Sequence, residues 1–241
     1  MKTKYLLTIL EGETASKDTL TSIAQNLDIK GATAETLTSD DYTTVTYKDS
    51  LEEALNAAFE KIKSSDFTHV CIVNNGSVLK EYASNTVKTY ITNDEILYMP
   101  MVELLDSSEP GSPFRGFLNS SLWKPYFATE IGVLDLQLAK KGVDLIIDGC
   151  YIPKKIISEH KLNPEIKYFS TFEFFNKIIS AGEEIVGIPK VTMRVVKDYT
   201  LKSIPNDEKL KYFKMAQSSA VEVLEVDEII TDALPEAGIS V

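Results

Sequence analysis

The chain contains 241 residues, of which 44% are hydrophobic and 25% are charged, and its formal net charge is −11. This length allows one large domain or two small ones with a substantial core. The composition is that of an ordinary soluble globular protein. The negative charge argues against a sequence-independent grip on phosphate backbones or anionic lipid. We therefore expect no general nucleic-acid-binding surface.

The cysteines and the apolar runs indicate the compartment. Cys71 and Cys150 each lie in an apolar run, which favours reduced core residues over a disulfide. No Cys/His spacing is typical of a metal site. The first apolar run is short and is broken at Thr8, unlike that of a signal peptide. No stretch approaches the roughly 18 apolar residues of a membrane span. We expect a cytoplasmic protein without a membrane span.

Strand and helix patterns alternate through the first ninety residues, which is typical of a mostly parallel sheet. Residues 4–10 are predicted as a buried strand. Apolar residues at helical spacing predict a helix over 16–27. Residues 31–48 have a weaker pattern, which indicates short strands around an acidic turn at Asp40 and Asp41.

The clearest unit covers residues 49–91, which are predicted as helix, strand, polar turn and helix. Ser50 and Glu53 form a capping box at the start of the first helix. Residues 67–73 are apolar enough for a central strand covered on both faces. The polar turn 74–77 follows that strand, at the end where ligands bind in open α/β sheets. The inner face of the second helix is expected to contain Leu79, Tyr82, Ala83, Thr86, Val87 and Tyr90.

The middle of the chain has a less regular pattern. Residues 96–105 predict a strand in which Pro100 marks an interruption or a sheet edge. Residues 107–127 form a long irregular stretch of the kind that is commonly functional or mobile. Helical spacing then returns over 128–140, and residues 143–147 are predicted as a short buried strand.

The last third of the chain contains two further helix patterns. Residues 150–157 are expected to continue from the preceding strand through a basic turn. Ser170 and Glu173 form a second capping box, which opens a helix. Residues 183–196 are predicted as an interrupted strand, and residues 207–224 as a helix before an acidic tail.

Three strings of sequence, taken in order, resemble family-2-type glycosyltransferases of the GT-A fold. Those enzymes move a sugar from a nucleotide-diphosphate donor. The strings are residues 16–26, SKDTLTSIAQN; residues 54–79, ALNAAFEKIKSSDFTHVCIVNNGSVL; and residues 170–190, STFEFFNKIISAGEEIVGIPK. The resemblance implies an α/β fold with a GT-A-like, mostly parallel central sheet flanked by helices.

The resemblance also implies a domain organisation. A single GT-A-like domain is expected over residues 1–196. Its nucleotide-binding half would cover residues 1–95, and its acceptor half residues 96–196. Residues 197–241 would then form a C-terminal helical extension with an acidic tail.

The metal motif of the family is absent in its usual form. The family places an Asp-x-Asp motif after the central strand, where carboxylates hold a divalent cation against the donor diphosphate. Here the matching positions carry Asn74, Asn75 and Gly76. Amides offer neutral oxygens, so we expect at most a weakly bound Mn²⁺ or Mg²⁺ with the donor. We assign no metal ligand and place these three residues at the nucleotide-sugar site.

The catalytic base of the family is also replaced. The resemblance puts Ser170 and Thr171 where an acidic pair usually lies, and Glu173 follows two positions on. A threonine hydroxyl cannot act as the base that deprotonates an acceptor hydroxyl. Glu173 is therefore the candidate base. The alternative is that Glu173 only completes its capping box.

Four other residues are candidates for ligand contacts. Asp40 and Asp41 fall near where the family contacts the nucleoside, although an exposed turn is the alternative. Glu11 ends the first strand at a ligand-facing edge, or it simply solvates a loop. Trp123 offers an aromatic platform for a sugar face at the acceptor site, or it fills a core.

Three functional hypotheses follow. The first is a glycosyltransferase that binds a nucleotide sugar of the UDP type across the first, second and central strands and transfers the sugar to an unknown acceptor. The acceptor would enter under residues 110–126. The second is a catalytically inactive GT-A-like binding or assembly protein, because carboxylates are missing from both key motifs. The third is a different α/β nucleotide-binding protein, which the strand order would reveal.

Overall fold

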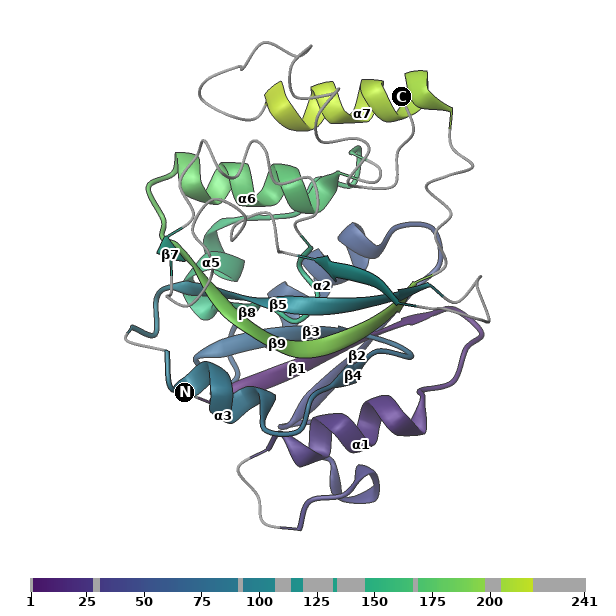
Figure 1. Cartoon of the computed structure of the whole chain (residues 1–241), viewed down its shortest axis with the longest axis vertical. Helices are drawn as coiled ribbons and strands as arrows, with labels where there is room; N and C mark the ends of the chain where they lie inside the picture. Colours follow the sequence, from purple (N-terminus) through teal and green to yellow (C-terminus); the bar gives the residue numbers. More distant parts are fainter. Residues whose placement is uncertain are drawn as a thin grey trace.

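One mixed sheet runs through the middle of the molecule, and helices cover both of its faces (Figure 1). The computed structural model describes residues 2–27, 31–90, 93–106, 114–118, 132–133, 146–166, 169–197 and 205–218.

Within the described ranges, the sheet contains nine strands. They are β1 (Thr3–Leu10), β2 (Tyr42–Tyr47), β3 (His69–Asn74), β4 (Val78–Leu79), β5 (Leu97–Asp106), β6 (Phe114–Leu118), β7 (Gly132–Val133), β8 (Tyr151–Pro153) and β9 (Ile185–Lys197). Their order is β2-β1-β3-β8-β5-β9-β4, with β6 paired to β5 and β7 paired to β9. Strands β2, β1, β3, β5 and β9 run in one direction, whereas β8 and β4 run in the other. The predicted mostly parallel sheet flanked by helices is confirmed.

The helices are α1 (Lys17–Gln25), α2 (Leu51–Ile62), α3 (Ala83–Lys88), α5 (Lys154–Glu159), α6 (Ser170–Ser180) and α7 (Asn206–Ser218), with a short 3₁₀ turn η1 (Ala34–Thr36). Helices α2, α5 and α6 lie on one face of the sheet, and α1 and α3 lie on the other (Figure 1). Within the described ranges, no helix is long and apolar enough to cross a membrane.

The central strand β3 shows why its sequence is uniformly apolar. Successive side chains of a strand point to opposite faces. Val70 and Ile72 pack into the core under α2, α5 and α6. Cys71 and Val73 pack into the second core, on the side of α1 and α3. Both faces are therefore covered, as predicted from residues 67–73.

The two cysteines are free and buried, as expected. Cys71 belongs to one core layer and Cys150 to the other. Burial raises the pKa of both thiols above the ordinary value. Both side chains therefore remain neutral thiols packed as small apolar groups.

Two helix starts differ in how they are capped. Ser50 caps α2 as predicted, because its Oγ accepts a 3.1 Å hydrogen bond from the backbone N–H three residues later. The predicted capping box of Ser170 and Glu173 is wrong. Helix α6 is preceded by Phe169, so Ser170 is already helical. The Ser170 hydroxyl instead donates a 2.6 Å hydrogen bond to Glu52 Oε1.

The segment after the polar turn is shorter as a helix than predicted. Leu79 belongs to β4, which pairs with β9. Tyr82 has a left-handed backbone with φ of 65° and is 60% exposed, so it is not on the inner face. Helix α3 begins at Ala83 and buries Ala83 and Val87. Strand pairing with distant β9 thus overrides the local helical spacing.

Strand β5 was expected to have an interruption or an edge at Pro100. The strand lies inside the sheet, between β8 and β9, so the edge alternative is wrong. Its register with β9 shifts between Pro100 and Met101, which is an interruption within the strand. A bulge of this kind accommodates the missing N–H of proline within an interior strand.

Three other expectations need correction. Residues 114–118 form β6, within the stretch that was expected to be irregular. Residues 132–133 form β7 rather than part of a helix over 128–140. Strand β8 and helix α5 replace the expected basic turn at 150–157. Most of the stretch 107–127 and of the expected helix lies outside the described residues.

Helix α7 packs on the outer side of α6 (Figure 1). The ring of Phe213 lies 5.4 Å from the ring of Phe169 and 5.5 Å from that of Phe172. Phe213 is 1% exposed. Helix α6 is therefore enclosed between the sheet and α7.

The buried imidazole of His69 makes stability depend on pH. Its Nδ1 lies 3.1 Å from Thr68 Oγ1, and its Nε2 lies 3.2 Å from the Ile96 carbonyl oxygen. Burial lowers the pKa of His69 below the ordinary value, although the Ile96 carbonyl opposes this shift. The unfolded chain then takes up a proton before the folded protein does. This contribution to stability is complete above about pH 6.5 and declines as the pH falls below that value.

We expect the free energy of unfolding, measured by urea titration, to fall between about pH 7 and pH 5. In His69→Gln this part of the slope should flatten, because the titrating group is gone. An unchanged slope in the variant would show that another group causes the dependence.

Candidate functional site

The loops after β1, β2 and β3 meet at the carboxyl edge of the sheet. The backbone N–H of Glu11 donates a 2.7 Å hydrogen bond to the Tyr47 carbonyl, which ties the end of β1 to the end of β2. The N–H of Asn75 donates a 2.9 Å bond to the Thr8 carbonyl, which ties β3 to β1. In open α/β sheets this edge is where ligands bind.

Two amides connect these loops. The Thr8 hydroxyl donates a hydrogen bond to Asn74 Oδ1. Asn75 Oδ1 accepts a 2.7 Å bond from the Ser16 N–H, at the start of α1. Asn75 Nδ2 donates a 3.2 Å hydrogen bond to Glu13 Oε2 and a 3.0 Å hydrogen bond to the Thr14 carbonyl oxygen. The two amides therefore hold the loop after β1 against the turn after β3.

Gly76 gives this turn its shape. Its φ of 85° lies in the left-handed region, which strains the backbone of any residue with a side chain. The space that a Cβ would occupy is open, so the backbone conformation alone favours glycine. Its N–H donates a 3.1 Å hydrogen bond to Thr19 Oγ1 on α1. The glycine thus contributes only its backbone conformation. The glycosyltransferases that the sequence resembles have a carboxylate at the matching position.

These residues do not fit a dedicated divalent-metal site. The side-chain oxygens of Asn74 and Asn75 are neutral, and each already accepts a hydrogen bond from the protein. Hard cations prefer several oxygen ligands with carboxylates among them. Over the part of the chain that the structure describes, no group of three His, Cys, Asp or Glu side chains with metal-like spacing lies at this edge.

The charges of three carboxylates act on Tyr47 at the end of β2. Burial raises the pKa of the Tyr47 phenol above its ordinary value, and the charges of Glu13, Asp148 and Glu52 raise it further. Asp148 is only 4% exposed and forms a parallel bridge with Ile72 of β3. The carboxyl edge is therefore acidic, although its central turn carries no carboxylate.

Glu52 reaches from α2 to the start of α6. Its Oε1 accepts the 2.6 Å hydrogen bond from the Ser170 hydroxyl, and its Oε2 accepts a 3.2 Å bond from the Ser50 hydroxyl. The family resemblance puts an acidic pair at Ser170 and Thr171. A carboxylate from another helix thus lies beside the position where the sequence lacks one.

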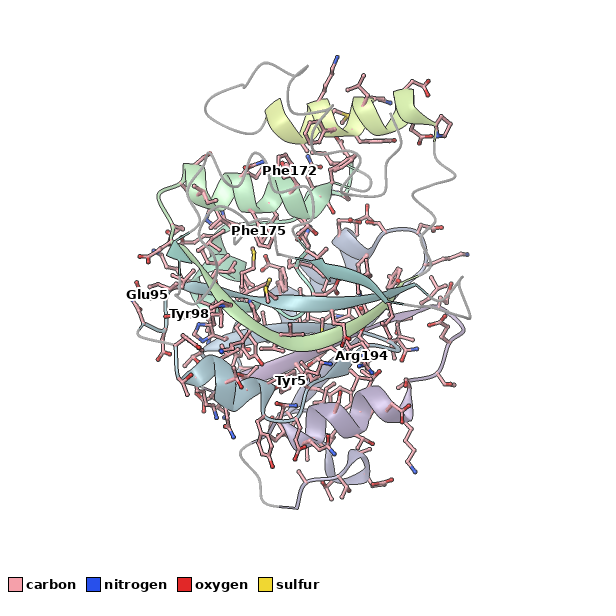
Figure 2. All side chains as sticks on the ribbon, viewed as in Figure 1. Tyr5, Glu95, Tyr98, Phe172, Phe175 and Arg194 are labelled. Carbon is pink, nitrogen blue, oxygen red and sulfur yellow. The ribbon has the colours of Figure 1, made fainter. Side chains whose placement is uncertain are left out.

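Glu173 occupies a different environment. It is fully buried and forms an ion pair with Lys177, one turn along α6. It follows Phe169 by four residues and so shares a helix face with that ring, which contacts Phe213 of α7. Figure 2 shows Phe175 on the sheet side of α6 and Phe172 on the α7 side. The structure does not bring Glu173 together with Asn74 and Asn75.

Asp40 and Asp41 lie at the opposite end of the sheet. They precede β2, and the Asp41 carbonyl accepts a 3.0 Å bond from the N–H of Tyr5, near the start of β1. The expected position of these two residues at the carboxyl ends of the strands is therefore wrong. The acidic turn comes before its strand, and parallel strands begin together at the amino edge. The pair lines a separate cavity of about 420 Å³ together with Lys2, Thr3, Tyr5, Asn26, Leu27, Thr36, Thr38, Ser84 and Lys88.

Of the remaining candidates, Glu11 is exposed at the carboxyl edge, where it was expected. Trp123 lies outside the described residues. Sequence reasoning missed Glu52, Asp148 and Tyr47 as members of this edge. The position of Glu52 in the first turn of a capped helix was visible, but only the tertiary contact with Ser170 reveals its role.

Comparison with known proteins supports the fold. No protein-family model matches the chain, and no curated protein sequence matches it. Solved structures do match. S. aureus TarS 1-349 in complex with UDP is 12% identical, with a TM-score of 0.60 over 97% of this chain and 71% of that chain. The same TarS piece in complex with UDP-GlcNAc is 10% identical, with a TM-score of 0.58 over 98% and 72%.

A third match is A197 from STIV, which is 10% identical, with a TM-score of 0.51 over 80% of this chain and 83% of that chain. Identities this low show the fold alone. The chain has the GT-A-like α/β architecture of the glycosyltransferases that the sequence resembles.

Proposed function

We propose that this chain binds a nucleotide-diphosphate sugar of the UDP type at the carboxyl edge of β1, β2 and β3, and transfers the sugar to an acceptor. The observation that carries the proposal is the convergence of the three loops at that edge, in a fold shared with a protein solved with UDP and with UDP-GlcNAc. Glu11, Asn74, Asn75 and Gly76 would contact the donor.

Glu52 is the base that this geometry favours over Glu173. Glu52 is half-buried beside Ser170, on the sheet side of α6, whereas Glu173 is fully buried on the side of α7. In the reaction, the Glu52 carboxylate takes the proton of the acceptor hydroxyl. The acceptor oxygen then attacks the anomeric carbon, the bond from that carbon to the diphosphate oxygen breaks, and the nucleoside diphosphate leaves.

Binding of the donor can be tested by thermal unfolding of the full chain with UDP and UDP-GlcNAc, with and without Mn²⁺. A ligand that binds only the folded protein stabilises it by about 2.7 kcal/mol at 100 times its dissociation constant. For a chain of this size we expect a rise in Tm of roughly 5–10 °C. The rise should not require Mn²⁺, because the amides do not form a cation site. No rise with either compound would overturn the proposal.

Binding without transfer is the second candidate. It is favoured by the amides of Asn74 and Asn75, whose oxygens are engaged within the protein, and by the absence of carboxylates at Ser170 and Thr171. Release of UDP from UDP-GlcNAc separates the two functions. A Tm rise without UDP release, in the presence of a range of sugar and protein acceptors, would favour the binding protein.

A further inference from the structure

A group of metal-ligand side chains lies away from the proposed donor site. One ring nitrogen of His160 and one carboxylate oxygen from each of Glu159 and Glu183 all lie within 4.8 Å of one another. The first two residues come from the end of α5, and the third from the turn between α6 and β9. A transition-metal ion lies about 2.0–2.2 Å from such ligands, so small rotations that draw the three atoms closer together would let one ion contact them all.

The imidazole at the centre of this group is incompletely satisfied. The Nε2 atom of His160 is buried and has no hydrogen-bond partner. A buried polar atom without a partner destabilises the fold, and folded proteins rarely leave one. An ion bound through Nε2 would give this atom the partner that the protein does not supply.

The backbone holds the ligands in place. The N–H of His160 donates a 2.9 Å hydrogen bond to the Ile156 carbonyl, which closes the last turn of α5. The N–H of Glu183 donates a 3.1 Å bond to the Ile178 carbonyl, at the end of α6. Both ligand-bearing segments are therefore fixed by helix ends, and only side-chain rotations are needed to complete a site.

Glu183 already pairs with a cation, the ammonium group of Lys155. A divalent ion carries more charge and would compete with that ammonium for the carboxylate. Lys155 Nζ lies 2.8 Å from Glu183 Oε1 and 2.9 Å from Glu183 Oε2. Glu183 thus holds one ammonium, whose partly exposed side chain can swing into solvent.

We propose that Glu159, His160 and Glu183 form a binding site for a divalent transition-metal ion of the Zn²⁺ type, in which the ion displaces Lys155 from Glu183. One imidazole nitrogen and two carboxylate oxygens suit Zn²⁺ better than the all-oxygen preference of Mg²⁺ or Ca²⁺. The site lies near the starts of β5 and β9, so it is independent of the donor site at the carboxyl edge.

Calorimetric titration of the chelator-treated full chain with Zn²⁺ tests this site. We expect one ion to bind per chain. His160→Gln and Glu183→Gln should each weaken binding by at least about tenfold. Lys155→Met should strengthen it, because the competing ammonium is gone. Glu165→Gln, which removes an exposed carboxylate elsewhere, is the matched control and should bind as the wild type does.

The variants change partly exposed side chains, and their Tm without zinc verifies that they fold. No binding of Zn²⁺ by the wild type would overturn the proposal. Equal affinity in His160→Gln and the wild type would also overturn it, since the ion would then be held by surface carboxylates alone.

Discussion

Glu52→Gln is expected to lower the rate of sugar transfer by about 100- to 10,000-fold, the range for loss of a general base. Glutamine keeps the size of the side chain and can still pair with Ser170, but it cannot take a proton. Donor binding should change little, because Glu52 acts on the acceptor. The measurement is UDP release at saturating donor, together with the Tm rise caused by UDP.

Two variants control this experiment. Ser170→Ala removes only the 2.6 Å hydrogen bond that positions the Glu52 carboxylate, so its loss of rate should be much smaller. Glu173→Gln removes the other candidate carboxylate. Loss of turnover in Glu173→Gln, with normal turnover in Glu52→Gln, would contradict the assignment of Glu52 and restore Glu173 as the base.

Phe175→Ala should destabilise the fold by about 3–5 kcal/mol, the usual cost of deleting a buried aromatic ring. Phe175 is fully buried on the sheet side of α6, in the core shared with α2 and α5. The free energy of unfolding from urea titration measures the effect. Tyr82→Ala is the matched control, because that ring is 60% exposed and its removal should cost no more than about 0.5 kcal/mol. Equal losses in the two variants would contradict the placement of α6 on the sheet.

The parts of the fold that could be predicted are those whose patterns are local. Residues 67–73 are apolar throughout because β3 is covered on both faces, and this shows in the sequence alone. Ser50 marks the start of α2 because a hydroxyl cap needs only neighbouring residues. The order of strands and helices through the first ninety residues follows from the same kind of signal.

The parts that could not be predicted depend on distant contacts. Leu79 looked helical but pairs with β9, more than a hundred residues later. Ser170 looked like a helix cap, but its hydroxyl bonds to Glu52 on another helix. Pro100 was expected at an interruption or a sheet edge, and only its pairing with β9 shows a register shift inside the sheet. In each case a tertiary partner decides the outcome.

The residues of the candidate site also fall into those that local patterns predict and those that only the tertiary structure shows. Asn74 and Asn75 were placed at the ligand edge because they follow a recognisable central strand. Asp40 and Asp41 were misplaced because the weak pattern of residues 31–48 did not show that the acidic turn precedes its strand. Glu52 was missed because neither its spacing nor its neighbours in the sequence mark it as part of a site.

The central claim is that the nucleotide binds at the carboxyl edge of β1, β2 and β3. A crystal structure of the full chain with UDP tests it most directly. We predict density for the nucleotide beside Tyr47, Asn74 and Asn75. Nucleotide bound instead in the cavity lined by Asp40 and Asp41, at the other end of the sheet, would contradict the account.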